Sequence, residues 1–366
     1  MIRWEQGRVG AVRRTWPGVQ QLTVEVRTDQ GTEQLSAISY TGLIGEVAVG
    51  DEVTLNTNAL RRGLGTGGDA FVVSRFGVTD PGDVPEPAGH MMKARYTPLQ
   101  VMVDSVDDPS SEHAYRINDA EEINGVPVVV ADLHSAVPAI VAGIHVDRPD
   151  ARIVYIHTDW AALPAQYSRA SAALRSAGAL EAVITCGQAF GGDLEAVSLP
   201  SALMAAVHVL EADAVIIAQG PGNLGTGTTW GFSGVRAAEA MNMAAAIGGT
   251  VIHSARVSES DERSRHRGLS HHSLTVLEKF THSPVAVPVL DPTDPLFRQI
   301  DADVCTALRP LKHEMHLVQS EGLLRALKES PVRLSSMGRS LADDPKAFLY
   351  PALAGRYAAA LIPAPW

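Results

Sequence analysis

The chain has 366 residues, with 30 Lys and Arg residues against 41 Asp and Glu residues, so its formal net charge is −11. This length favours two or three domains. Hydrophobic residues make up 45% and charged residues 19%, which is typical of a globular chain and excludes a disordered one. The acidic balance argues against a general nucleic-acid-binding protein, because such a protein needs a basic face.

Several features bear on the compartment. Two cysteines, Cys186 and Cys305, are too few for a disulfide framework. The first residues are charged and contain no apolar signal core. Two apolar, uncharged runs, 196–210 and 240–255, are shorter than the roughly 18 residues of a membrane-spanning helix. We therefore expect a cytoplasmic protein that does not enter a membrane.

The first 77 residues predict a small all-β domain. Five segments alternate or are rich in β-branched residues, and turn residues separate them; they are 8–12, 20–27, 33–38, 52–56 and 70–75. Short strands at this spacing predict a small barrel or sandwich. RNA binding through this domain is a weaker hypothesis, because the charge of residues 1–77 is near neutral.

Residues 78–94 are interpreted as a linker, because the prolines and glycines at its start cannot continue a strand ladder or a helix. Residues 95–366 then form the second predicted domain. Short apolar runs alternate there with Ala-rich helical stretches; the runs are 99–103, 126–131, 152–156, 182–185, 214–218 and 250–253. This pattern predicts an α/β fold with a mostly parallel, doubly wound sheet covered on both faces. Three later runs, 274–277, 285–290 and 315–318, either extend the sheet or form an appended layer.

Candidate site residues follow the predicted strands. In open α/β sheets, ligands bind beyond the carboxyl ends of the strands. Five strand ends in succession carry such residues: Asp132 and His134, then His157 and Asp159, then Gly191, Gly192 and Asp193, then the 220–229 loop, then His253 and Arg256. If the strands are parallel, these ends converge on one edge, and the histidines favour a convergent site because they have no capping role. The alternative is that Gly, Asp and Ser are only turn and N-cap residues.

The glycine-rich loop after Gln219 matches G-x-G-x-x-G by letter. However, a helix is predicted to start only near Ser233, and the next strand ends without an acidic residue, so we exclude a nicotinamide cofactor. No G-K-[ST] follows, which excludes a Walker loop. Glycines let backbone N–H groups approach an anion, and threonines add hydroxyl donors. The residues assigned to anion binding are Gly220, Gly222, Gly225, Thr226, Gly227 and Thr228; a loop that needs glycine only for its turns is the alternative.

The segment 253–272 contains the most chemistry. His266, His271 and His272 are candidates for a general base or for metal ligands, with Arg256 and Arg265 as anion-binding residues. The spacing matches no familiar zinc motif. A strand is predicted to begin at 273, and on an extended chain the adjacent histidines point to opposite faces, so at most one reaches a shared centre. The alternative is a solvated charged loop with internal ion pairs.

Four runs of the sequence resemble the motifs of a known family. They are 158–164 (TDWAALP), 189–197 (AFGGDLEAV), 220–228 (GPGNLGTGT) and 265–272 (RHRGLSHH). In this order they resemble a bacterial family of uncharacterised proteins, domain of unknown function 3866, over nearly the whole chain. The resemblance implies no activity, because the family has none assigned. It implies only that these four runs belong together.

The leading hypothesis is an enzyme, a hydrolase or group transferase, that acts on a small anionic metabolite. The phosphate or carboxylate of the metabolite would bind on the 220–229 loop, with Arg256 as a further binding residue. Asp132, His134, Asp159, His266 and His271 would supply acid–base chemistry or hold a divalent metal, with His157 and His271 as metal candidates. The rival hypothesis is a ligand-sensing or scaffold protein with the same crevice and no chemistry. No organic cofactor is identified, no nucleic-acid partner is expected, and a homodimer stays open.

Overall fold

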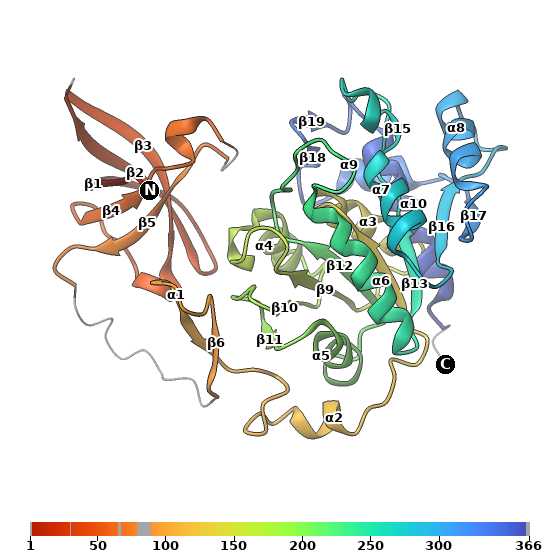
Figure 1. Ribbon diagram of the computed structural model, residues 1–366, viewed down its shortest axis with the longest axis horizontal. Coiled ribbons are helices and arrows are strands. Elements are labelled where there is room, and N and C mark those ends of the chain that lie inside the picture. The colour runs from red at the N-terminus through yellow and green to blue at the C-terminus, as the bar shows by residue number, and fades with distance from the viewer. Residues whose placement is uncertain (1, 30, 65–66, 79–88, 364–366) are drawn as a thin grey trace. The chain divides into compact units, whose positions relative to one another are not determined.

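The computed structural model describes residues 2–29, 31–64, 67–78 and 89–363, and the chain divides into two compact units (Figure 1). The first unit contains Met1–Ala88 and Ala94–Val101, and the second contains Gly89–Lys93 and Met102–Trp366. Residues 79–88 of the predicted linker lie outside the described residues. Within the second unit, Met91–Lys93 form strand β6, which pairs with β7 (Val101–Val103).

The first unit is a closed five-stranded barrel with the strand order β1-β2-β3-β5-β4, as the predicted small β-domain requires. Its elements are β1 (Trp4–Trp16), β2 (Val19–Thr28), β3 (Gly31–Tyr40), α1 (Thr41–Ile44), β4 (Glu52–Asn56), η1 (Leu60–Arg62) and β5 (Ala70–Arg75). Only β3 and β5 pair in parallel. Alternate residues fill the interior, for example Leu22, Val24 and Val26 of β2, because successive side chains of a strand point to opposite faces.

The second unit is built on an eight-stranded sheet in which every pairing is parallel, which confirms the predicted α/β fold. The strand order is β11-β10-β9-β12-β8-β13-β16-β17. These strands are β8 (Pro127–Ala131), β9 (Ile153–Thr158), β10 (Ala182–Cys186), β11 (Leu194–Ala196), β12 (Ala214–Gln219), β13 (Thr250–Ser254), β16 (Ala286–Leu290) and β17 (Glu314–Val318). Two small hairpins pair β14 (Val257–Ser258) with β15 (Gly268–Leu269) and β18 (Ser335–Ser336) with β19 (Arg339–Ser340).

Helices connect these strands. The α-helices of the second unit are α2 (Ala114–Asn118), α3 (Val137–Asp147), α4 (Arg169–Ser176), α5 (Leu199–Met204), α6 (Ala237–Ala246), α7 (His271–Thr275), α8 (Gln299–Leu308), α9 (Leu323–Glu329) and α10 (Lys346–Leu361). Short 3-10 segments are η2 (His134–Ala136), η3 (Ala165–Tyr167), η5 (Ser233–Arg236) and η6 (Ser264–His266), and π-helical turns are η4 (Ala205–Val209) and η7 (Val276–Phe280). Among helices of the described residues, none is long and apolar enough to cross a bilayer.

Both faces of the sheet are buried. In β8, Val128 and Val130 belong to one core cluster, whereas Val129 and Ala131 belong to another. The first cluster contains side chains of α5, α6 and α8, and the second contains side chains of α3, α4 and α10. Because strands in a two-sided core bury successive residues on both faces, they are near-continuous apolar runs, which is why the sequence revealed them.

The strand order places a topological switch between β8 and β12. After β8 the chain moves to β9, β10 and β11 on one side, returns to β12 beside β8, and then continues through β13, β16 and β17 on the other side. α3 follows β8 and α6 follows β12; α3 buries most of its apolar side chains in the second cluster, whereas α6 buries its own in the first. Connections that leave in opposite directions open a crevice at the carboxyl ends of the two strands.

Two of the predicted sheet strands differ from the structure. The run 99–103 contributes only β7, which pairs with β6 and lies outside the eight-stranded sheet. The run 274–277, with the strand expected from 273, lies instead in α7 and η7 (Figure 1). Ser270 caps α7, and its Oγ accepts a hydrogen bond from the backbone N–H of His272 at 3.2 Å. A capped first turn favours a helix over the β preference of Thr275 and Val276. The runs 285–290 and 315–318 do extend the sheet, as β16 and β17.

Candidate functional site

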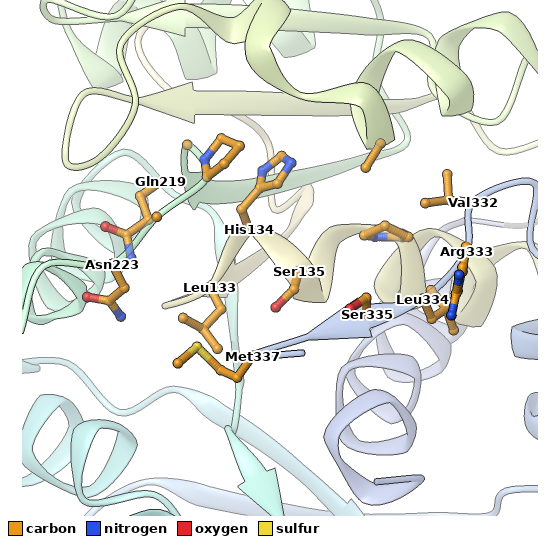
Figure 2. A pocket seen from close by; sticks show the side chains of 15 residues that line it. Leu133, His134, Ser135, Gln219, Asn223, Val332, Arg333, Leu334, Ser335 and Met337 are labelled. Carbon is orange, nitrogen blue, oxygen red and sulfur yellow. The ribbon is translucent and has the colours of Figure 1, made fainter. Parts of the chain in front are cut away.

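A cavity of about 290 Å³ lies at the topological switch (Figure 2). Segments at the ends of β8 and β12 line it: His134 and Ser135 belong to η2, which follows β8, and Gln219 ends β12 before the 220–223 loop. The segment 332–337 covers it, and this segment carries the cavity's one arginine, Arg333, among the described residues. The cavity therefore occupies the place where sheets of this kind bind ligands.

His134 lines this cavity, but both of its ring nitrogens already have partners. Its Nδ1 lies 3.0 Å from the Tyr155 hydroxyl and its Nε2 lies 2.6 Å from Ser168 Oγ. Burial, with a smaller contribution from His157, lowers the pKa of His134 to about 3. The imidazole is thus neutral at pH 7 and is held in place by hydrogen bonds, so it shapes the cavity wall.

His157 and Asp159 follow β9 and make local contacts. The His157 ring lies 6.4 Å from the His134 ring, and its Nε2 donates to the Ala162 carbonyl at 2.8 Å. Burial lowers the pKa of His157 to about 4. Asp159 Oδ2 accepts from the Gln188 backbone at 3.0 Å, and a Cβ at Gly187 would lie only 2.4 Å from that oxygen. Asp159 therefore fixes the turn after β10.

The Gly191–Asp193 motif holds the turn between β10 and β11. Gly191 N–H donates to Glu195 Oε1 at 2.6 Å, and Gly192 N–H donates to Thr185 Oγ1 at 3.2 Å. Asp193 Oδ2 accepts from the Val183 backbone at 2.8 Å. These groups bind one another, and none of the three residues lines the cavity at the switch.

The glycine-rich loop divides into two parts. Residues 220–223 line the cavity, so the predicted Gly220 and Gly222 lie there. The rest folds back on itself: Gly225 bridges to Phe232, and the hydroxyls of Thr226 and Thr228 lie 3.0 Å apart. A Cβ at Gly227 would lie 3.3 Å from Arg265 Nη2, so this part of the loop reaches the 265–272 segment.

Asp132 and Arg256 line a second, smaller hollow of about 20 Å³ between the ends of β8 and β13. Asp132 is buried, and its Oδ2 has no hydrogen-bond partner among the described residues. Burial raises the pKa of Asp132, while the nearby Arg256 charge opposes the rise. Room for about one water-sized group remains between a carboxyl and a guanidinium.

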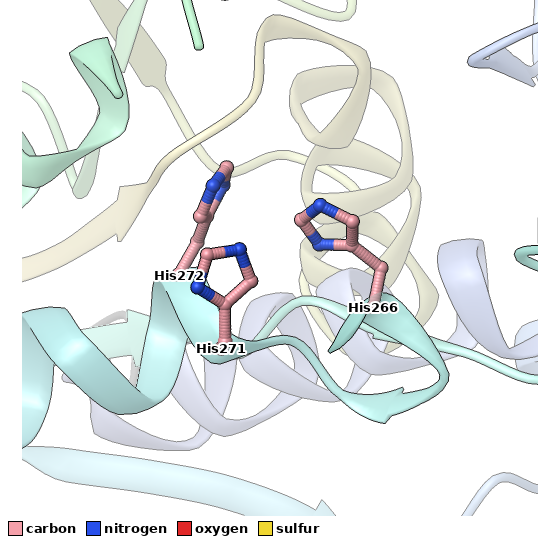
Figure 3. A group of neighbouring side chains, drawn as sticks. All are labelled: His266, His271 and His272. Atoms are coloured by element: carbon pink, nitrogen blue, oxygen red, sulfur yellow. The ribbon is translucent and has the colours of Figure 1, made fainter. Parts of the chain in front are cut away.

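Arg256 connects this hollow to a histidine cluster, which consists of His266, His271 and His272. Its Nη1 lies 3.5 Å from His272 Nδ1. The ring centroids of the cluster are 4.3 to 4.9 Å apart, and one nitrogen of each ring lies within 4.8 Å of the others (Figure 3). The expectation that at most one of the adjacent histidines reaches a shared centre is therefore wrong. They begin a helix, where successive residues differ by about 100° and not by 180°.

The cluster is held neutral. Burial, followed by the charges of Arg256 and Arg263, lowers the pKa of His266 to about 3. Burial and its histidine and arginine neighbours lower the pKa of His272 to about 3, and burial and Arg265 lower that of His271. Uncharged imidazoles keep a lone pair, which is what a base or a metal ligand needs.

Two of the four sequence motifs, 220–228 and 265–272, lie beside one another. The model of a protein family described as a protein of unknown function, DUF3866, matches residues 36–355, which is most of the chain. The chain belongs to the DUF3866 family. No curated protein and no solved structure matches it. The DUF3866 motif 265–272 contains the histidine cluster, and 220–228 contains both Gly227 beside Arg265 and the cavity-lining turn.

The sequence did not predict roles for two residues near the histidine cluster and its arginines. Phe232 stacks on the His272 ring, with 3.8 Å between centroids and planes 1° apart. Asp261 accepts from Arg263 and Arg339 at 2.9 and 3.0 Å, and these arginines hold its pKa well below the usual range. Phe232 carried no signal, since a lone aromatic is ordinary core. The excess of arginines around Asp261 did signal pairing, but not with residue 339, which is distant in sequence.

Proposed function

We propose that this chain is a hydrolase or group transferase acting on a small metabolite that carries a phosphate or carboxylate. The observation that carries the proposal is a hollow that a buried carboxyl shares with the guanidinium of Arg256; the carboxyl oxygen, Asp132 Oδ2, has no hydrogen-bond partner within the described part of the chain. The histidine cluster adjoins Arg256. Buried titratable groups with displaced pKa values that meet at a strand-end crevice are typical of catalytic sites.

Arg256 is the proposed anion-binding residue. Its side chain is 10% exposed, and Asp261 at 3.9 Å is the one carboxylate among the described residues within salt-bridge reach. That carboxylate already binds Arg263 and Arg339 at shorter distances. A guanidinium with this little compensation favours an anionic oxygen of an incoming phosphate or carboxylate, and the hollow has room for one such oxygen.

The groups around that anion would supply the acid–base chemistry. The imidazoles of the histidine cluster are uncharged at pH 7 and offer lone pairs to a proton or to a metal ion, whereas burial favours the protonated form of Asp132, which donates a proton. A pair of groups whose surroundings displace their pKa values in opposite directions is the arrangement that acid–base catalysis requires.

The test compares the full chain with Arg256→Gln and with a matched control, Arg309→Gln, whose side chain is exposed at the end of α8. Inorganic phosphate and citrate are titrated by calorimetry, and p-nitrophenyl phosphate, bis(p-nitrophenyl) phosphate and p-nitrophenyl acetate are assayed for hydrolysis. We expect anion binding in the chain and in the control, and at least tenfold weaker binding in Arg256→Gln. Equal affinities in the two folded variants would refute the proposal for this site.

The hydrogen bonding of His134 favours a second candidate, a ligand-sensing protein without catalysis. Both ring nitrogens are occupied, so the larger cavity presents no free base from that residue. This candidate predicts that an anion binds with the same dependence on Arg256, that the chain hydrolyses none of the test substrates, and that Asp132→Asn leaves the anion affinity unchanged. Turnover that Asp132→Asn abolishes without loss of binding would exclude it.

A further inference from the structure

The histidine cluster has the donor geometry of a metal site. His266 ends η6, and His271 and His272 begin α7, so two short elements bring the three rings together (Figure 3). One nitrogen from each ring lies within 4.8 Å of the other two. Nitrogens that share a tetrahedral ion at about 2.0–2.1 Å are roughly 3.3 Å apart, so the rings must move closer together to hold one ion.

The hydrogen bonds within the cluster leave ring nitrogens available to bind a metal ion. His266 Nδ1 lies 2.8 Å from Ser270 Oγ, which orients the ring and leaves Nε2 for another partner. His271 Nε2 is buried and has no hydrogen-bond partner among the described residues. An orphaned buried nitrogen costs stability unless something binds it. A second partner on the opposite nitrogen, as Ser270 provides, is the usual way in which proteins orient a metal-binding histidine.

We propose that His266, His271 and His272 bind one divalent transition-metal ion of the zinc class and leave a coordination position open to an anionic oxygen. Imidazole donors suit zinc, copper, nickel and cobalt, and disfavour magnesium and calcium, which prefer oxygen. Three protein ligands with an open position distinguish catalytic from structural zinc sites. This inference deepens the proposed function and rests on it for the identity of the fourth ligand.

The surrounding charges determine what that fourth ligand is. Besides burial, the positive charges of three arginines lower the pKa of His271 in the cluster; they are Arg265, Arg256 and Arg263. The nearby Asp261 carboxylate is already shared between two arginines. A dication here adds to an electropositive site, so an anion must accompany it. The substrate class is therefore a phosphate- or carboxylate-bearing molecule whose oxygen binds the ion while Arg256 binds the same group.

The contact between Arg256 and His272 links the two events. At 3.5 Å, Arg256 Nη1 reaches His272 Nδ1 only while that nitrogen is an acceptor. If the ion takes Nδ1, the acceptor is used; if the ion takes Nε2, the proton moves to Nδ1. Either way the guanidinium loses this partner and becomes free for the anion. Metal and anion should therefore bind with positive coupling.

The experiment uses the full chain without a polyhistidine tag, stripped with a chelator and titrated with Co²⁺ or Zn²⁺ alone. Metal content after gel filtration, the visible spectrum of Co²⁺ and competition with a chromophoric chelator give stoichiometry, coordination and affinity. We expect one ion per chain and at least tenfold weaker binding in His271→Ala and in the bulkier His271→Gln. The matched control is His282→Ala, an exposed histidine after η7, which should bind as the unsubstituted chain does.

Inorganic phosphate supplies the second arm. It should tighten metal binding at least threefold, and Arg256→Gln should remove that gain while leaving one ion bound. Circular dichroism checks that each variant is folded. A chain that binds no stoichiometric ion, or one whose affinity is the same in folded His271→Gln and His282→Ala, overturns the metal site. If no ion binds, phosphate binding that still depends on Arg256 leaves the proposed function standing. Metal binding without phosphate binding leaves the three-histidine metal site standing but refutes the proposed function and, with it, the anionic fourth ligand.

Discussion

The buried ion pair of Lys93 tests how much a single charge contributes to the stability of the second unit. Lys93 ends β6, is fully buried, and places its Nζ 2.7 Å from Glu195 Oε2. The ammonium also donates to the carbonyls of Ala189 at 2.7 Å and Thr185 at 3.3 Å. The substitution Lys93→Met keeps most of the side-chain volume and removes the charge. We predict a large loss of stability because the Glu195 carboxylate stays buried without its cation.

The magnitude follows from the burial of both partners. The Glu195 side chain is 11% exposed and that of Lys93 is 0% exposed, so water cannot replace the lost partner. Breaking a buried pair from one side costs about 3–5 kcal/mol, whereas replacing both charges is close to neutral. Lys93→Met and Glu195→Gln should each reach that range, and the double variant should lie within about 2 kcal/mol of the unsubstituted chain.

Urea denaturation of the full chain gives the free energies of unfolding, and hydrogen exchange of peptides from β10 and β11 locates the loss. The matched control is Lys279→Met, whose pair with Glu278 is half-exposed and should contribute less than about 1 kcal/mol. Two outcomes would refute the reasoning: a Lys93→Met loss as small as that of the control, or single losses that simply add in the double variant.

Two further predictions concern buried groups. His253 has both ring nitrogens buried without partners among the described residues, and burial lowers its pKa to about 3, so His253→Leu should raise the free energy of unfolding at pH 7 by about 1–3 kcal/mol. Between pH 6.5 and 3 the unfolded chain binds more protons at this residue than the folded chain does, so the free energy of unfolding falls as the pH falls. Without His253 this fall should be smaller by up to about 1.4 kcal/mol per pH unit. Denaturation at pH 7 and at pH 4.5 measures both effects, and a variant less stable than the unsubstituted chain at pH 7 contradicts the prediction. A Cβ at Gly143 in α3 would lie 2.1 Å from the Ala352 carbonyl oxygen of α10. Gly143→Ala should therefore cost about 1–3 kcal/mol through overpacking and lower the melting temperature. The control is Gly42→Ala, whose Cβ would meet nothing within 4 Å and which should leave the melting temperature unchanged.

The fold was predictable where local pattern and tertiary position agree. The barrel strands alternate because one side of each strand faces the interior, and the sheet strands are apolar throughout because both faces are covered. The order of those strands was not predictable. β12 inserts between β8 and β9, and only long-range pairing, such as Ile217 with both Val130 and Ile156, determines that placement. The crevice depends on that order, so its position could be expected only in general terms.

The histidine cluster shows where the site reasoning failed and why. Thr275 and Val276 favour a strand, and a strand separates adjacent side chains by about 180°. The competing signal was Ser270, a capping residue directly before the pair, and a capped first turn reduces that separation to about 100°. Both rings then lie beside His266, which the 3-10 turn brings back along the chain. A difference of 80° per residue therefore decides whether the segment 265–272 can hold two histidines or three at a common centre.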